Sequence, residues 1–363
     1  MPLRGLILQS FRCHRSLTLS LSPTTNVIVG NNAAGKTSII EALALLSVGE
    51  SFRAEHDEDM IVFGQELARL KTVLDVTSTN EDGETKVDSD ELEVVLTRGM
   101  LQGKAVQKKH FLVNNARKRK KDFVGHFATV VFRPEDMRLI EGSPTRRRQF
   151  IDTILSVTDR GYAESLSTYE NALKRRNKLI DQVRDGQMPR TVLNYWTLLI
   201  IKHGQVVQEC RRAFFQTFSF ANYPINFQVE YLPSIMSEER MQQYADKEIA
   251  AGHTLIGPHK DDFKVNFLMA ANPAWIDVSQ FGSRGQQRLA VLWLKLNELR
   301  YVEETLGQRP VLLLDDILSE LDREHRRQVE ELLEVGQSVV TTTEPSVVED
   351  LQKTIPSLQV ITL

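Results

Sequence analysis

The hydrophobic positions at the start of the chain change from alternating to helical spacing. Residues 6–8 are apolar, and leucines at 17, 19 and 21 are separated by polar residues, as in β-strands. A short apolar run at 27–29 leads directly into a glycine. From Thr37 onward, apolar residues recur with the spacing of a helix. The pattern predicts a strand, a loop and a helix, in that order.

Strand and helix signals continue along the chain and flank a long helical region. Residues 75–93 are polar and predict a hairpin or an exposed loop, and Asn114 and Asn115 predict a turn. Residues 142–221 predict mainly helix, with a break at Pro189 between two helices. Further strands are expected at 94–96, 111–113, 225–232, 265–267, 311–314 and 338–342, and helices at 286–304 and 324–333. Together these signals predict an α/β fold.

Composition limits the class of protein. The chain has 363 residues, of which 41% are hydrophobic, enough for one large or two ordinary domains. It lacks the run of roughly 18 apolar residues that a membrane span needs, so we expect a cytoplasmic protein without membrane association. The only cysteines, Cys13 and Cys210, do not have metal-ligand spacing and are interpreted as buried or incidental thiols.

A glycine-rich segment between the predicted strand and helix matches the pattern of a phosphate-binding loop, G-x-x-x-x-G-K-[ST]. Its backbone N–H groups and the helix N-terminus would hold the phosphates of ATP, and Lys36 would reach the β and γ phosphates. The Thr37 hydroxyl would ligate Mg²⁺. The alternative is an ordinary glycine-containing turn. The candidate ATP-binding residues are Gly30, Asn31, Asn32, Ala33, Ala34, Gly35, Lys36, Thr37 and Ser38.

A second candidate element lies far downstream, where the apolar strand predicted at 311–314 ends in two acids. A buried parallel strand that delivers carboxylates at its C-terminal end is the Walker B arrangement. Asp315 is the candidate Mg²⁺ ligand, and Asp316, with Lys36, is the candidate catalytic residue because it could polarise the attacking water. The alternative, a helix N-cap, leaves the phosphate loop without another metal partner.

A third motif begins the helix that precedes this strand. Its core, Ser283, Arg284, Gly285 and Gln286, offers a hydroxyl and N–H groups at a helix start. Alone it is also compatible with an ordinary helix cap. Followed by the Walker B strand and then by residues 319–322 (Ser-Glu-Leu-Asp), it gives the order of signature, Walker B and D-loop found in ABC-type ATPases. In such ATPases the signature contacts the γ-phosphate held by the opposite subunit, which implies an ATP-dependent homodimer.

With these motifs the chain resembles the RecF family, bacterial recombination mediators whose heads are related to those of SMC proteins. Further matching segments span nearly the whole chain. They are Phe11-Arg12, residues 51–53, 131–136, 142–148 and Asp152, Tyr169 with residues 175–177, Trp196 with Gly204, residues 257–262 and residues 341–343.

The resemblance implies an α/β fold: an ABC-type P-loop ATPase lobe, here residues 1–130 and 255–363, with an inserted mainly helical lobe at 131–254. It also implies binding of duplex DNA and of junctions between single- and double-stranded DNA, and action with RecR and RecO to load RecA. Asp316 in place of glutamate and Thr343 in place of a switch histidine predict slow, DNA-stimulated ATP hydrolysis that acts as a switch. Residues 135 and 136 are candidates for the role of the missing glutamine loop.

Basic residues are concentrated in one part of an otherwise mildly acidic chain. Residues 101–150 hold 13 lysines and arginines against four acids, although the net charge is −3. Such residues could contact DNA phosphates, although a solvated loop is the ordinary interpretation of a charge run. The candidate DNA-binding residues are Lys118, Arg119, Lys120, Lys121, Arg146 and Arg147.

Two other classes of ATPase share these nucleotide motifs. A transport ATPase would have its phosphate loop and signature much closer together than Gly30 and Ser283, which are 253 residues apart. A chromosome-organising SMC protein would insert hundreds of heptad-patterned residues between them. The short insertion here favours the RecF type over both alternatives.

Overall fold

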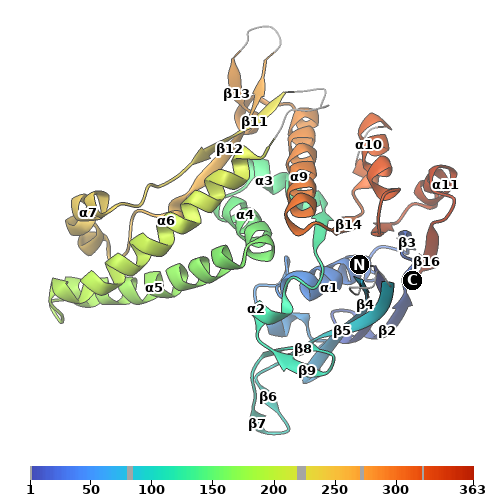
Figure 1. The fold of residues 1–363 in the computed structure, drawn as a ribbon, viewed down its shortest axis with the longest axis horizontal. Helices are drawn as coiled ribbons and strands as arrows, with labels where there is room; N and C mark the ends of the chain where they lie inside the picture. Colours follow the sequence, from blue (N-terminus) through green and yellow to red (C-terminus); the bar gives the residue numbers. More distant parts are fainter. Residues whose placement is uncertain (1, 80–84, 219–225, 270–273, 321–322) are drawn as a thin grey trace. The chain divides into compact units, whose positions relative to one another are not determined.

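The computed structural model describes residues 2–79, 85–218, 226–269, 274–320 and 323–363. The chain forms two compact units (Figure 1). Unit 1 contains Met1–Glu135 and Val302–Leu363, and unit 2 contains Asp136–Tyr301. Unit 1 is therefore built from both ends of the chain, and unit 2 is the segment that lies between them in the sequence.

A parallel sheet carries the predicted nucleotide motifs in unit 1. Its strands are ordered β10-β14-β15-β3-β16, and each neighbouring pair is parallel. All five residues of β14 are buried, as expected for a strand covered on both faces. The strands are β3 Thr25–Val29, β10 Thr129–Phe132, β14 Val311–Asp315, β15 Ser338–Thr342 and β16 Gln359–Thr362. The strands predicted at 27–29, 311–314 and 338–342 are confirmed.

An antiparallel sheet, ordered β2-β1-β4-β5-β8-β9, forms the rest of the strand framework of unit 1. The predicted polar hairpin at 75–93 is the distal part of two long paired strands, and residues 80–84 of that prediction lie outside the described residues. Asn114 and Asn115 both have positive φ, which suits the tight β8–β9 turn. The strands are β1 Leu3–Phe11, β2 His14–Ser20, β4 Leu67–Thr79, β5 Thr85–Thr97, β8 Lys109–Val113 and β9 Ala116–Lys118.

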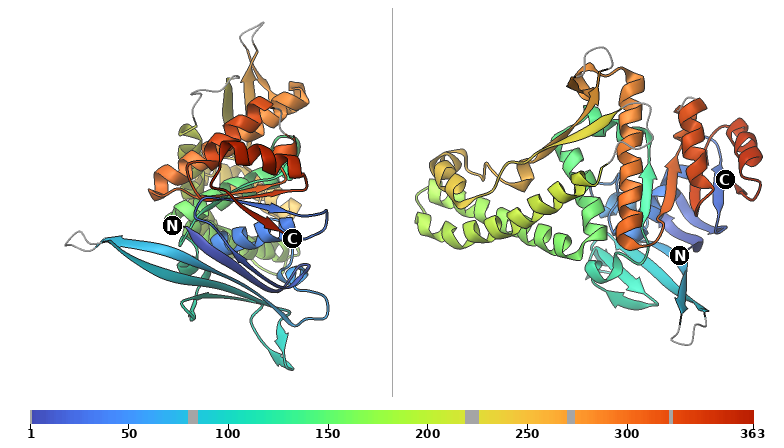
Figure 2. Two further views of the ribbon diagram at one scale, coloured as in Figure 1. Left: turned by 90° about the vertical axis from the view of Figure 1, so that its right-hand side faces the viewer. Right: turned by 45° about the horizontal axis from the view of Figure 1, so that its top comes forward.

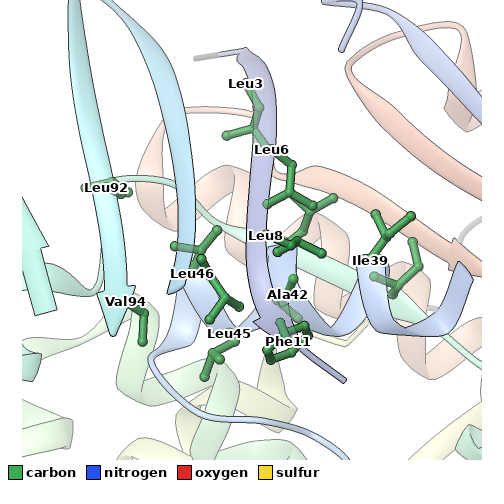
Figure 3. Close-up of a cluster of buried hydrophobic side chains, with 14 of the residues drawn as sticks. Leu3, Leu6, Leu8, Phe11, Ile39, Ala42, Leu45, Leu46, Leu92 and Val94 are labelled. Carbon is green, nitrogen blue, oxygen red and sulfur yellow. The ribbon is translucent and has the colours of Figure 1, made fainter. Parts of the chain in front are cut away.

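Helix α1, Lys36–Val48, contacts strands of both sheets. Figure 3 shows Ala42, Leu45 and Leu46 of this helix beside Leu6 and Leu8 of β1. Eleven of the 13 helix residues are buried, so α1 is apolar around most of its circumference. The phosphate loop therefore leads into a deeply buried helix of unit 1.

Short elements complete unit 1. They are η1 Asp57–Met60, β6 Met100–Leu101, β7 Lys104–Ala105, α2 Lys120–Phe123, η5 Leu318–Glu320, α10 Arg323–Leu333 and α11 Pro345–Thr354. Helix α10 confirms the helix predicted at 324–333.

Unit 2 is mainly helical, as expected for the middle of the chain. Helices α5, Arg160–Arg184, and α6, Asn194–Gln216, pack side by side (Figure 2), and Pro189 lies in the break between them. The antiparallel sheet β11-β12-β13 adds strands to this unit. Its other elements are η2 Pro134–Met137, which begins in unit 1, α3 Arg138–Glu141, α4 Pro144–Thr158, η3 Arg190–Leu193, β11 Phe227–Leu232, α7 Glu238–Ala251, η4 Pro258–Lys260, β12 Asp262–Leu268, β13 Trp275–Asp277 and α8 Val278–Phe281.

The two units divide the chain differently from the expected lobes over residues 255–301. These residues group with unit 2 because β12 pairs with β11 and β13, and α8 packs on β12. Helix α9, Arg284–Leu306, begins in unit 2 and ends in unit 1. Within the described part of the chain, no helix is both long and apolar enough to cross a membrane.

Candidate nucleotide site

The predicted phosphate loop lies between β3 and α1. Gly35 occupies the N-cap position of α1 with φ 98°, and no side chain caps this helix end. The first turn contains no acidic residue. Because uncapped N–H groups and the helix dipole favour negative charge, this end of α1 can receive an anion.

The Lys36 side chain folds back over the loop that precedes it. Its Nζ donates hydrogen bonds to the Gly30 carbonyl at 2.7 Å and to the Asn31 carbonyl at 3.0 Å. Only 7% of the residue is exposed. The ammonium is therefore held at the loop that would carry phosphates.

Close packing explains the glycine at position 35. A Cβ there would lie 2.3 Å from His14 Nε2 and 2.6 Å from Cys13 Sγ, and the positive φ would strain any other residue. Ala33 also has a positive φ, 65°, a conformation that glycine adopts more readily than alanine. Cys13 is exposed beside the loop, so of the two expected alternatives, a buried or an incidental thiol, the buried one is wrong for this residue.

Asp315 lies at the C-terminal end of β14, within reach of the loop. Its Oδ1 accepts hydrogen bonds from Thr37 Oγ1 at 3.1 Å and from Thr341 Oγ1 at 2.8 Å. Burial raises the pKa of Asp315, the two hydroxyls oppose this, and the carboxylates of Glu135 and Asp316 add to it. A buried carboxylate with raised pKa and two hydroxyl neighbours is well suited to a bound cation.

Asp316 follows in a conformation that is unusual for its residue type. Its φ is 51°, and its backbone N–H donates to the Thr341 carbonyl at 3.2 Å and to Thr341 Oγ1 at 3.1 Å. Burial raises the pKa of the side chain, opposed by the Lys36 charge and a hydrogen bond from the Thr343 backbone. Its Oδ1 is buried and has no hydrogen-bond partner among the described residues. This oxygen can accept a hydrogen bond from a water molecule.

These side chains line one pocket of about 590 Å³ in unit 1. The pocket contains hard oxygen donors beside a cation and a helix N-terminus, a combination that fits a magnesium–nucleotide complex. Mg²⁺ is commonly held by one or two carboxylates together with substrate phosphates and water, and Asp315 and Asp316 supply carboxylates at this pocket. The lining residues are Arg12, Cys13, Asn32, Ala33, Gly35, Lys36, Thr37, Ser38, Arg53, Asp59, Ile61, Phe63, Asp315 and Asp316.

A buried ion pair supports the pocket wall and was not predicted. Glu41 of α1 is inaccessible to solvent and receives two hydrogen bonds from Arg12, at 2.6 and 2.8 Å. Ser51 Oγ donates to the same carboxylate at 2.5 Å. A buried carboxylate needs such partners. The sequence held no signal for this pairing, because the partners come from separate segments.

The signature residues lie at the exposed N-terminus of α9 in unit 2. The Ser283 N–H donates to Gln286 Oε1 at 2.8 Å, and the Gln286 N–H donates to Ser283 Oγ at 3.3 Å. This reciprocal pair is a capping box. Arg284 forms an ion pair with Glu141. Ser319 Oγ donates to the Asp316 carbonyl at 2.9 Å, whereas Leu321 and Asp322 of the expected D-loop lie outside the described residues.

Two of the four candidate DNA-binding residues in unit 1 form ion pairs with acidic residues. Lys118 on β9 is exposed, while Arg119 pairs with Asp122 at 2.8 Å and Lys120 pairs with Glu50. Lys121 is exposed at the start of α2. The cluster is therefore less positive than its sequence indicates, because Glu50 is contributed by a distant segment.

The two candidate arginines on α4 differ in their surroundings. Arg146 is exposed, whereas both carboxylate oxygens of Asp262 accept hydrogen bonds from Arg147, at 2.6 and 2.9 Å. Arg147 also donates to the Gly142 carbonyl at 2.8 Å. Arg146 is thus available to an external anion, and Arg147 is used within unit 2.

The sequence matches one known family along almost its whole length. The family described as "RecF/RecN/SMC N terminal domain" matches residues 2–360. A protein of Moorella thermoacetica named DNA replication and repair protein RecF is 33% identical, over 95% of this chain and 90% of its own length. The protein of that name from Thermomicrobium roseum is 35% identical, over 96% of this chain and 95% of its own length.

Solved structures agree with this likeness. A structure described as the recombination mediator protein RecF with ATP, in the RecFOR pathway, superposes with TM-score 0.82 and 28% identity. It is matched over 95% of this chain and 92% of its own length. A second structure of RecF, with ATPrS, gives TM-score 0.81 at the same identity, over 95% of this chain and 93% of its own. An SMC head at 15% identity and TM-score 0.50 shares the fold alone.

Proposed function

Because this chain belongs to the RecF family of DNA replication and repair proteins with an ABC-type ATPase fold, we propose that it is an ATP-driven switch on DNA. ATP binds at the phosphate loop and joins two copies of the chain, and hydrolysis separates them. The observation that carries this proposal is the meeting of Lys36, Thr37 and two strand-end carboxylates in one pocket.

Each residue of the pocket has a role in this proposal. Lys36 exchanges its two carbonyl partners for the β and γ phosphates. Thr37 and Asp315 hold Mg²⁺, which when bound would neutralise phosphate charge. Asp316 orients the attacking water through its unpartnered oxygen. Glu135, whose charge influences the pKa of Asp315, contributes to the environment of the ion.

The second half of the composite site comes from another copy of the chain. The exposed start of α9 offers Ser283 and the neighbouring backbone N–H groups to a γ-phosphate held on the partner subunit. The Ser283 hydroxyl accepts a hydrogen bond from the Gln286 N–H, so its own proton can be donated to a phosphate oxygen while the capping box stays closed. Hydrolysis is slow and DNA-stimulated in this proposal, as expected for a switch.

DNA contact uses the exposed cations rather than the whole basic segment. Lys118 and Arg146 are exposed and can reach phosphates, and Lys121 is also exposed. Arg119, Lys120 and Arg147 have acidic partners that a phosphate would have to displace. Phosphate contacts give little sequence preference, which fits a protein that acts at junctions and on duplex DNA. We place its action in the cytoplasm, with RecO and RecR in the loading of RecA. The solved relatives described as members of the RecFOR pathway support this placement.

Sedimentation tests the switch directly. The wild-type chain is sedimented alone, with ATP and Mg²⁺, and with both plus duplex DNA. We expect a monomer without nucleotide, a dimer with ATP, and a DNA-bound dimer when all are present. A monomer under every condition would overturn the proposal.

The salt dependence of duplex binding tests the DNA contacts. Replacing Lys118, Lys120 and Lys121 together by glutamine should lower the salt slope by about one to two phosphate contacts, since each contact adds about 0.9. Lys120 adds least because Glu50 already pairs with it. Lys353→Gln, at an exposed lysine of α11, is the matched control. An unchanged salt slope would show that these lysines do not contact DNA and belong to an ordinary solvated loop.

A further inference from the structure

Phe63 is the most exposed large hydrophobic residue in the described part of the chain, at 98%. It also lines the pocket that contains Lys36 and Asp315. An exposed phenylalanine loses the favourable free energy of burial, so an isolated one beside a polar pocket indicates a contact partner that is absent from the free protein.

A rigid turn presents this side chain. The Gln65 N–H donates to the Val62 carbonyl at 3.0 Å, and Gly64 has φ 79°. This geometry is that of a type II turn with Phe63 at its first corner. The Arg98 guanidinium stabilises the turn, because it donates hydrogen bonds to the Gln65 carbonyl at 3.0 Å and to the Ile61 carbonyl at 3.3 Å. The backbone at Phe63 is therefore fixed before any ligand binds.

Backbone pairing links the turn to the phosphate loop. Val62 N–H donates to the Ser10 carbonyl at 2.9 Å, Arg12 N–H donates to the Met60 carbonyl at 2.8 Å, and Phe11 forms a β-bridge with Ile61. Two residues after Arg12, His14 Nε2 lies 3.1 Å from the Gly35 carbonyl. This chain of contacts sets the position of the turn that carries Phe63 relative to the phosphate loop.

We propose that Phe63 is the stacking surface for the nucleobase of the bound nucleotide. The proposal rests on nucleotide binding at the phosphate loop. The charged lining of the pocket, including Arg12, Arg53 and Lys36, suits phosphate and ribose, which leaves Ile61 and Phe63 as its aliphatic and aromatic part. Since every base has a π-face, stacking adds affinity without selecting a particular purine.

A comparison of the affinities for ATP and for inorganic tripolyphosphate isolates the contribution of the nucleobase to binding. Stacking contributes about 1–3 kcal/mol, so Phe63→Ala should weaken ATP binding about tenfold. It should weaken GTP binding by the same factor and leave the affinity for tripolyphosphate unchanged. Phe63→Trp should retain ATP affinity, and the emission of the introduced indole should change with ATP but not with tripolyphosphate. Tyr195→Ala, at a 65% exposed aromatic in unit 2, should change neither affinity.

The outcomes separate this inference from the proposed function. If Phe63→Ala binds ATP as the wild type does, or weakens ATP and tripolyphosphate equally, the stacking role is wrong while nucleotide binding stands. If the wild-type chain binds neither ATP nor tripolyphosphate, the proposed function is wrong and the stacking role is lost with it. Calorimetric titration of the full chain with each probe measures every case.

Discussion

Two helix N-termini carry the predicted phosphate contacts, and they differ in how their N–H groups are satisfied. Helix α1 begins without any side-chain cap. Helix α9 begins with Ser283 and Gln286 capping each other. At the start of α1 no side chain competes for the N–H groups, whereas at the start of α9 the N–H groups of Ser283 and Gln286 are already bonded and fewer donors face an anion. Affinity for nucleotide should therefore come from α1, and α9 should respond only when a partner presents a bound phosphate.

The largest effect on ATP hydrolysis is expected from a substitution at the N-terminus of α1. Lys36→Arg keeps the charge but places a planar, extended group where a compact ammonium fits. ATP hydrolysis should fall by at least about a hundredfold, the scale for losing one preorganised electrostatic contact. Steady-state phosphate release measures it, and circular dichroism controls for folding. Hydrolysis at the wild-type rate in this variant would contradict the assignment of residues 30–37 as a phosphate-binding loop.

Substitution of Ser283, at the N-terminus of α9, should separate ATP binding from ATP hydrolysis. Ser283→Arg places a bulky cation where the phosphate of the partner subunit must dock, so ATP affinity of the monomer should stay near wild type while dimerisation and hydrolysis are lost. Asp316→Asn should instead accumulate ATP-bound dimers, because Asp315 still holds the metal. Titration calorimetry and sedimentation measure the two effects.

Mixing these two variants tests whether the site is shared. A heterodimer contains one composite site with an intact phosphate loop, an intact Asp316 and an intact signature. Partial ATPase activity should reappear on mixing. A mixture that stays inactive, although both proteins are folded and bind ATP, would contradict the shared site and the role of Ser283.

The buried carboxylate of Asp315 should reduce the stability of the metal-free protein. Burial raises the folded-state pKa of Asp315, so its stabilising contribution is present below the unfolded pKa and is lost as pH rises through the raised folded value. Asp315→Asn should therefore raise the Tm at pH 7 with chelator present, and the difference should vanish below about pH 4. Scanning calorimetry measures it, with exposed Asp246→Asn as control. A lower Tm for Asp315→Asn at pH 7 would contradict the argument.

The smallest effect concerns the cap itself. Ser283→Ala removes the hydroxyl that accepts from Gln286, at a cost of about 1 kcal/mol to the start of α9. Hydrogen exchange of the first-turn amides of α9 should become faster, and Ser283→Thr should restore protection. Unchanged exchange would show that the capping box contributes nothing in solution.

Local patterns predicted the nucleotide elements well because their chemistry is contiguous in sequence. The strand, glycine loop and helix around Lys36 appear in the order that apolar spacing indicates, and the buried run ending at Asp315 is β14. Sequence order could also place Pro189 between two helices. Each of these predictions depends on neighbours within a few residues.

Pairings between distant segments could not be predicted in this way. The Arg12–Glu41 ion pair, the Thr341 hydroxyl on Asp315 and the Glu50 partner of Lys120 all join residues from separate parts of the chain. The full length of β4 and β5 was missed because its polar end resembled a loop. Nothing in the sequence around Phe63 indicated that its ring would stand exposed beside the phosphate loop.

The strand order of the parallel sheet has a consequence for biosynthesis. Strand β3, which leads into the phosphate loop, is bordered by β15 and β16, and Ser338 Oγ donates to Thr25 Oγ1 across 313 residues of chain. During translation β3 is made long before its neighbours, because β15 follows at residues 338–342 and β16 at residues 359–362. The nascent chain therefore carries an incomplete nucleotide pocket throughout most of its synthesis. If ATP binds as proposed, a nascent chain that has not yet reached β14 lacks Asp315 and Asp316 and should not respond to cellular ATP.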